Sequence, residues 1–236
     1  MPIRELADAD AGWMAELMAR RRAEYETYSP TFWRRAVGVE ELHASFLRRT
    51  IGQSQNIAMR VERGFITAVP RAGQFYADDF ALDDEATWES DGRTLVLAAW
   101  TEAKQRGATA LRVVTAARDV PKVAMLRNAG MVVSERWWVR ALDVDPPGTV
   151  YEGTITGDGF AAVMSAAPPV YDPGGPVVLI TAFRDAASLR MAELKAMNSG
   201  VVLSILPIAA GSLPHEQAAR NGGYEVASEF YVGQPE

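Results

Sequence analysis

The sequence repeats itself once, and this repeat constrains the fold more than any other feature. Three landmarks recur in the same order, 93 to 95 residues apart. They are Gly64-Phe65 and Gly159-Phe160, Arg127–Gly130 and Arg220–Gly223, and Ser134-Glu135 and Ser228-Glu229. A fixed spacing in a fixed order is typical of a duplicated structural unit. We therefore predict two related halves, 1–145 and 146–236, the second without the first strand and the first two helices.

The segment from Phe75 to Thr115 predicts a strand, a helix and a parallel strand. The side chains of Phe75–Leu82 would alternate between the two faces of a sheet. An apolar stripe at helical spacing covers Thr94–Gln105, and Leu111–Thr115 is apolar and β-branched. These elements form a βαβ unit, so we expect an α/β fold with a mixed (α+β) sheet.

The remaining elements follow from capping residues and turns. Asp8 or Asp10 caps a helix to about Tyr25, and Ser29-Pro30 opens a second helix that Gly38 interrupts. Arg63-Gly64 is expected to form a two-residue hairpin turn. Further elements are expected at Ile3–Leu6, Ile57–Glu62, Phe65–Pro70, Val120–Asn128, Met131–Leu142, Tyr151–Ile155, Phe160–Ser165, Val177–Phe183, Ala186–Met197, Val201–Ile205, Pro214–Asn221 and Glu225–Val232.

Composition argues against several classes of protein. Cysteine is absent, which removes disulfides and thiolate sites and favours the cytoplasm. His43 and His215 are the two histidines, too few for a histidine-rich metal site, so we expect no metal. No apolar run approaches the roughly 18 residues of a membrane span. The net charge of −6 disfavours nucleic acid as a partner.

The order of elements resembles the GNAT superfamily of N-acetyltransferases, in full over residues 3–140 and in part over 149–233. Tyr76–Leu82 is similar to the fourth strand of that family, in which an acid-acid-apolar triplet precedes the donor-binding loop. Gly92–Leu95 is similar to the end of that loop, and Met125–Met131 to the last helix with its following glycine. The order of elements is the specific part of the resemblance, since each motif alone is weak.

The resemblance implies acetyl-CoA as the donor substrate. Backbone groups of Phe80, Ala81 and Leu82 would pair with the pantetheine. The pyrophosphate would lie on Ser90, Asp91, Gly92, Arg93 and Thr94, where free N–H groups and the helix dipole favour an anion. The chain departs from the family here, because only the last glycine of the expected loop is present. Seven acids and no Lys or Arg occupy residues 78–91.

The resemblance also places a catalytic acid–base residue at the end of the fourth strand. Asp78 or Asp79 would take a proton from the ammonium group of the acceptor, directly or through water. The alternative is that both are solvated acids at a strand end. The tyrosine that the family often carries in its last helix is replaced by Leu126 in the first half and by Ala219 in the second.

Aromatic residues near the predicted junction of the first two helices give two interpretations. Tyr25, Tyr28 and Trp33 would either fill the core or line the acceptor site. Trp137, Trp138, Phe230 and Tyr231 are expected at the junction of the two halves. Alternatively, the two tryptophans fill the core of their own half.

These observations favour an N-acetyltransferase that moves an acetyl group from acetyl-CoA to a small cationic amine, which the acids at 78–91 would attract. Two alternatives stay open: a GNAT-like protein that binds a ligand or partner without catalysis, and a GNAT-fold enzyme with another acyl donor. The second half is expected to be structural, since its loop at Thr181–Ser188 lacks glycine. A homodimer is compatible with either role.

Overall fold

The computed structural model describes residues 2–145, 147–149 and 152–235, which form two compact units. Unit 1 comprises Met1–Tyr25, Gly38–Ser134 and Phe230–Glu236. Unit 2 comprises Glu26–Val37 and Glu135–Glu229. The fold class is α/β with a mixed sheet, as expected.

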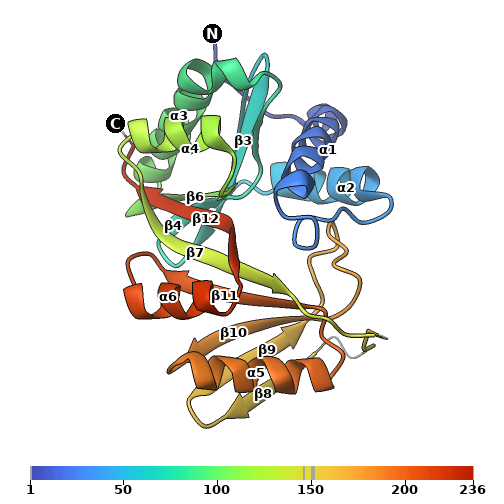
Figure 1. Ribbon diagram of the computed structural model, residues 1–236. Coiled ribbons are helices and arrows are strands. Elements are labelled where there is room, and N and C mark those ends of the chain that lie inside the picture. Colours follow the sequence, from blue (N-terminus) through green and yellow to red (C-terminus); the bar gives the residue numbers. More distant parts are fainter. Residues whose placement is uncertain (1, 146, 150–151, 236) are drawn as a thin grey trace. The chain divides into compact units, whose positions relative to one another are not determined.

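Unit 1 has helices on both faces of its sheet, with α1 and α2 on one side of β3 and α3 and α4 on the other (Figure 1). Its strands are β1 (Arg4–Glu5), β2 (Ile57–Val61), β3 (Gly64–Arg71), β4 (Gln74–Ala77), β5 (Phe80–Leu82) and β6 (Ala110–Ala116). Its helices are α1 (Ala11–Tyr28), α2 (Val39–Ile51), α3 (Arg93–Gln105) and α4 (Val120–Asn128), with short turns η1 (Asp8–Asp10), η2 (Glu85–Thr87) and η3 (Trp88–Gly92).

The core of unit 1 has two layers because neighbouring residues of β3 point to opposite faces. Phe65 packs with Leu17 and Leu47 on the side of α1 and α2. Ile66 packs with Leu95 and Leu111 on the side of α3 and β6. The alternation of a strand thus positions both helical layers.

Unit 2 repeats the later elements of unit 1 in the same order. It contains β8 (Gly153–Gly157), β9 (Phe160–Ser165), β10 (Val177–Phe183), α5 (Ala186–Asn198), β11 (Leu203–Ala209) and α6 (Leu213–Asn221). Helices α3 and α5 have 13 residues each, α4 and α6 have 9 each, and the members of each pair begin 93 residues apart. The structure therefore shows the repeat; whether its second copy is incomplete stays a prediction.

The closing strands are exchanged between the units. Strand β7 (Val132–Ala141) starts in unit 1, but from Glu135 onward it belongs to unit 2 and pairs antiparallel with β11. Strand β12 (Glu225–Gly233) does the reverse, and from Phe230 onward it belongs to unit 1. The predicted division 1–145 and 146–236 stays a prediction and differs from the two units in these strands and in Glu26–Val37.

The exchange places two aromatic side chains in unexpected cores. Tyr231 is fully buried in the core of unit 1, where it packs in the same cluster as Leu111 and Met131. Trp138 is buried in the core of unit 2 with Leu206. The interpretation that Trp138 fills the core of its own half is therefore wrong.

Three local predictions need correction. The second helix begins not at Ser29 but at Val39, because Gly38 takes a left-handed conformation with φ of 71° and starts the helix anew. The residues of the first hairpin turn are Glu62-Arg63. The predicted strand Phe75–Leu82 is broken into β4 and β5.

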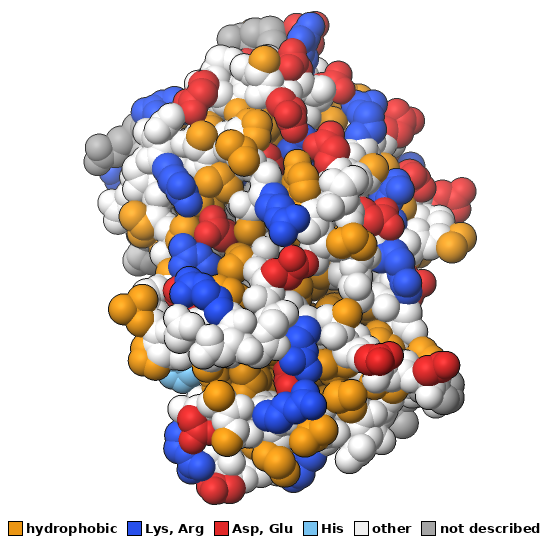
Figure 2. Space-filling view, in the orientation of Figure 1, with side chains coloured by type: hydrophobic (Ala, Val, Ile, Leu, Met, Phe, Trp, Pro, Cys, Tyr) orange, Lys and Arg blue, Asp and Glu red, His pale blue; other side chains and the backbone are white. Residues whose placement is uncertain are grey.

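The described residues bear on two further expectations, those about a membrane-spanning helix and a metal centre. No helix within the described ranges is long and apolar enough to cross a bilayer. Among the same residues, no three His, Asp or Glu side chains gather as metal ligands would. Positive and negative side chains are interspersed on the face shown in Figure 2.

Candidate functional site

The break between β4 and β5 is where the sheet of unit 1 opens. Strand β4 pairs in parallel with β6 up to Ala77, opposite Val113. After Asp78 and Asp79 the chain continues as β5, which pairs with β3. The gap that follows is the region in which the sequence predicted the reacting groups.

The two aspartates at the break lie in different surroundings. Asp79 is only 6% exposed, whereas Asp78 is exposed. Desolvation by the surrounding protein and the neighbouring Asp79 carboxylate raise the pKa of Asp78. Asp78 is therefore crowded by protein and still open to solvent, which suits a group that exchanges protons with a ligand.

Asp79 is held by two side chains from the α1 and α2 layer. Its Oδ1 lies 3.0 Å from His43 Nε2 and 3.6 Å from Arg22 Nη2. Burial would raise the pKa of Asp79, but His43, Arg22 and Lys122 lower it overall. Asp79 is thus a charged structural partner, and the alternation of a strand end separates it from Asp78.

Lys122 bridges the gap between the parted strands. Its Nζ donates to Phe80 O on β5 at 3.0 Å and to Val114 O on β6 at 3.1 Å. The side chain is only 2% exposed and lies over the rings of Phe80 and Trp88. Burial lowers the pKa of Lys122 to about 8, although Asp119 opposes the shift.

A buried ionic network surrounds this lysine. Asp119, the N-cap of α4, is fully buried and accepts hydrogen bonds from Tyr25 Oη and Arg21 Nη2, each at 2.8 Å. Burial and the Asp119 carboxylate raise the pKa of Tyr25 well above its usual value. Tyr25 is therefore a neutral hydrogen-bond donor to Asp119 in the core, rather than an exposed wall.

Three of the acids that follow the break pair with arginines, two of which come from α1. Arg20 pairs with Asp83 at 2.6 Å and Arg21 with Glu85 at 3.0 Å. Asp84 pairs with Arg63 at 3.4 Å. These arginines offset part of the negative charge of the segment, so its attraction for a cation is smaller than the sequence suggested.

The predicted pyrophosphate residues are part of a continuous helical turn. The turn η3 runs directly into α3, and the N–H of Arg93 already donates to Ser90 O and Trp88 O. Gly92 is in helical conformation, and a Cβ there would meet the Trp88 ring at 2.6 Å. Gly92 thus makes room for Trp88, and the start of α3 lacks the open N–H groups that a phosphate needs.

Side chains of the same segment also have local partners. Arg93 donates to Asn128 O at 2.8 Å, and Thr94 Oγ1 donates to Ser90 O at 2.8 Å. Asp91 is half-buried, while Phe80, Ala81 and Leu82 are buried. Local contacts thus engage the side chains of Arg93 and Thr94, and the anion contacts of this segment stay a prediction.

The three predicted acceptor residues do not form one group. Tyr25 belongs to unit 1, whereas Tyr28 and Trp33 belong to unit 2. Trp33 is 7% exposed, donates to Ala227 O at 3.4 Å and packs edge-on against Phe32. In its own unit, Trp33 is a core residue.

Unit 2 has a corresponding gap with other residues. Strands β10 and β11 pair in parallel from Val177 to Leu179, and β10 then continues to Phe183. His215 Nε2 lies 3.1 Å from Phe183 O, which places it where Lys122 contacts Phe80 O. Asp185 caps α5 and accepts from Ser188 N at 2.8 Å, so a carboxylate of the protein occupies that helix start.

Comparison with solved structures identifies the fold of the chain. No family model and no curated protein matches the sequence. A GCN5-related N-acetyltransferase from Sphaerobacter thermophilus is 12% identical, with a TM-score of 0.60 over 98% of this chain and 95% of that one. The chain has the GNAT fold.

Two further solved structures agree with this assignment of the fold. A protein from Thermoplasma acidophilum assigned as an acetyltransferase is 12% identical, with a TM-score of 0.57 over 98% of both chains. One from Pyrococcus horikoshii is 10% identical, with a TM-score of 0.52 over 98% of this chain and 88% of that one. At such identities the GNAT likeness concerns the fold and not the substrate.

Sequence reasoning missed Lys122, His43 and Asp119 as site residues. A lysine in a short helix is ordinarily predicted to lie on the surface. The available signal was the repeat itself, since Lys122 and His215 are 93 residues apart and each directly follows a proline at a helix start.

Proposed function

We propose that the chain is an acetyltransferase that moves the acetyl group of acetyl-CoA to a small cationic amine, with Asp78 as the base. The observation that carries the proposal is an exposed carboxylate with a raised pKa at the strand break of a GNAT fold. An ammonium group must lose a proton before its nitrogen can attack a thioester carbon. Asp78 takes that proton, and the neutral nitrogen forms its bond to the acetyl carbon. The bond from carbon to sulfur then breaks, and the CoA thiolate takes the second proton that the nitrogen loses.

The proposed donor contacts need local rearrangement. Phe80 and Leu82 offer backbone groups on the edge that faces the gap, whereas those of Ala81 face β3, and Lys122 Nζ already donates to Phe80 O. The proposal therefore requires that Lys122 releases Phe80 O, which then accepts a hydrogen bond from acetyl-CoA. Phosphate contacts at Ser90–Thr94 require that η3 unwinds and frees its N–H groups.

The first experiment is calorimetric titration of the full chain with acetyl-CoA, followed by turnover assays on a panel of mono- and diamines. Saturable binding at one site and transfer to at least one amine support the proposal. Absence of both binding and turnover, with CoA and longer acyl-CoAs equally inactive, would contradict it.

Substitution of the base is the sharper test. Asp78→Asn should lower turnover at least about tenfold and leave the free energy of unfolding nearly unchanged, because the side chain is exposed. Asp83→Asn, which changes an exposed acid of the same segment, is the matched control and should keep turnover. Equal turnover of wild type and Asp78→Asn would remove Asp78 from the mechanism.

A further inference from the structure

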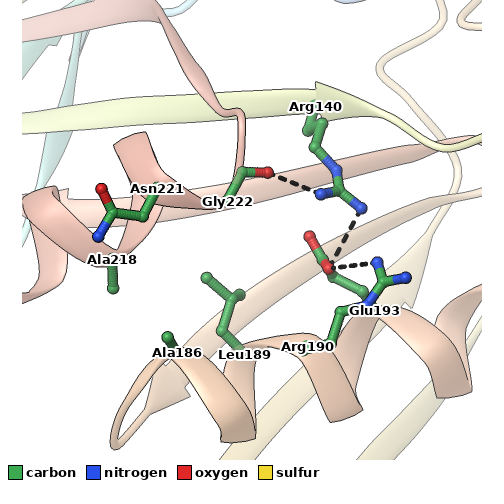
Figure 3. Close-up of a pocket in the computed structure, with 8 residues that line it drawn as sticks. All are labelled: Arg140, Ala186, Leu189, Arg190, Glu193, Ala218, Asn221 and Gly222. Atoms are coloured by element: carbon green, nitrogen blue, oxygen red, sulfur yellow. Dashed lines mark hydrogen bonds and ion pairs between the residues drawn. The ribbon is translucent and has the colours of Figure 1, made fainter.

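Unit 2 contains a hollow of about 300 Å³ between α5 and α6 (Figure 3). Its apolar lining comes from Ala186, Leu189 and Ala218. Its charged lining comes from Arg140 on β7 and from Arg190 and Glu193 on α5. The hollow therefore combines a hydrocarbon surface with a group of three charges.

The three charges form a defined arrangement. Glu193 is only 2% exposed, and its Oε2 lies 3.2 Å from Arg140 Nη2 and 3.3 Å from Arg190 Nη1. Arg140 also donates to Gly222 O at 2.6 Å, which fixes its guanidinium at the end of α6. Burial and the Glu193 carboxylate, with which Tyr224 shares a hydrogen bond, raise the pKa of Tyr224.

Unit 1 shows that the fold does not need these charges. The residue 93 positions before Glu193 is Trp100, which is 8% exposed and part of the core cluster that includes Val96 and Met125. A buried ion pair loses much of its Coulomb energy to desolvation, so an apolar filling is at least as stabilising. The polar hollow of unit 2 is therefore a departure that stability alone does not explain.

Charge and hydrogen-bonding capacity define the ligand. Two guanidinium groups and one carboxylate leave a net charge of +1 around the hollow. The side chain of Arg190 is 55% exposed, and of its five N–H donors only those on Nη1 face Glu193. A monoanion that accepts hydrogen bonds from Arg190 would neutralise this net charge. A hydrocarbon part attached to it would cover Leu189 and Ala218.

We propose that this hollow binds a small organic carboxylate, with the acid group on Arg190 and Arg140 and the hydrocarbon part between α5 and α6. Glu193 positions both arginines. The site lies in unit 2, whereas the proposed acetyl transfer takes place in unit 1, so one can fail without the other.

The test is calorimetric titration of the full chain with hexanoate, with hexanamide as the neutral match and inorganic phosphate as the other anion. Hexanoate should bind at one saturable site and hexanamide should not. Arg190→Gln should weaken hexanoate binding at least about tenfold, because a charge-assisted contact is lost. Ala218→Met introduces the residue of unit 1 at this position, Met125, and should abolish binding by filling the hollow.

Arg184→Gln is the matched control, since Arg184 is an exposed arginine of unit 2 outside the lining. It should leave hexanoate binding unchanged, and circular dichroism should confirm that every variant is folded. Arg190 is exposed, so its variant keeps the test decisive even if Ala218→Met fails to fold.

Four results would overturn the proposal. They are the absence of saturable binding of hexanoate, equal binding of hexanamide, binding of phosphate alone, and unchanged affinity in Arg190→Gln. Displacement of hexanoate by CoA would assign the hollow to an acyl-donor site and would overturn it as well.

Discussion

In both units, a side-chain nitrogen from a short helix contacts a backbone carbonyl at the gap in the sheet. The residue that supplies the nitrogen differs between the units. In unit 1, Lys122 Nζ donates to Phe80 O at 3.0 Å. In unit 2, His215 Nε2 lies 3.1 Å from Phe183 O. Both residues occupy the third position of a nine-residue helix and contact the phenylalanine near the end of the parted strand. The fold therefore ties the helix to the strand end through a nitrogen-bearing side chain in each copy.

The surroundings of these two residues differ. Lys122 is buried and has a second carbonyl, Val114 O, as acceptor. His215 is half-buried, and its Nδ1 lies 2.8 Å from Ser212 Oγ. The comparison shows that both units use this helix position to contact the end of a strand. In unit 1 the contact also buries a side chain that can carry a charge, which costs free energy.

The largest expected effect concerns the independence of the units. A fragment of residues 1–145 lacks Phe230–Gly233 and therefore the buried Tyr231 of the unit 1 core. It should aggregate or bind a hydrophobic dye, measured by size-exclusion chromatography and fluorescence. Addition of a peptide of residues 225–235 should reduce both effects. A soluble and folded fragment would contradict the exchange of closing strands.

The second prediction separates the two cores. Tyr231→Ala should lower the stability of unit 1 and Trp138→Ala that of unit 2, each by about 3–5 kcal/mol, because each leaves a large cavity. Hydrogen exchange resolved by residue can assign the loss. Loss of protection in the unit to which the residue belongs by sequence, rather than by packing, would argue against the exchange.

The third prediction uses the pKa of Lys122, which burial lowers from 10.5 to about 8. Above pH 8 the folded chain releases this proton while the unfolded chain keeps it, so the contribution of Lys122 to stability rises with pH. Between pH 7 and 9.5 the wild type should gain about 2 kcal/mol relative to Lys122→Met. The measurement is urea unfolding at both pH values.

Lys104→Met is the control for that experiment, since Lys104 is an exposed lysine. Its difference in stability from the wild type should not change with pH over the same range. A difference between wild type and Lys122→Met that is constant with pH would mean that Lys122 titrates normally.

The smallest effect is expected at the corresponding position of unit 2. His215→Ala removes one hydrogen bond to Phe183 O and should cost about 1 kcal/mol. Thermal unfolding of the variant, followed by hydrogen exchange near α6, would measure the loss. A loss of stability as large as that of a core truncation would mean that His215 does more than form this hydrogen bond.

Most element positions were predictable because strand and helix periods are local properties. The strand Val177–Phe183 and the helix Val120–Asn128 agree with the structure to the residue. The helix expected from Ser29 failed because a capping pattern competes with Gly38, whose left-handed conformation starts the helix ten residues later. The order of elements identified the fold even though single motifs were weak.

The candidate site was predictable in place but not in detail. The acid pair at the strand end was found, but its division into exposed Asp78 and buried Asp79 depends on His43 and Arg22, which are distant in sequence. The exchange of closing strands was out of reach for another reason. In a repeat with nearly identical strand patterns, either closing strand satisfies either sheet, so sequence periodicity does not discriminate between them.

The exchange has a consequence for synthesis on the ribosome. The main segment of unit 1 ends at Ser134, but its core is complete only after Tyr231 has been synthesised. At typical rates of translation, this interval lasts roughly 5 to 20 seconds. During that time β6 lacks its later neighbour in the sheet, β12, and presents an unpaired edge. A nascent chain of this kind depends on the speed of its own elongation, and slow codons after residue 134 would lengthen its exposure to aggregation.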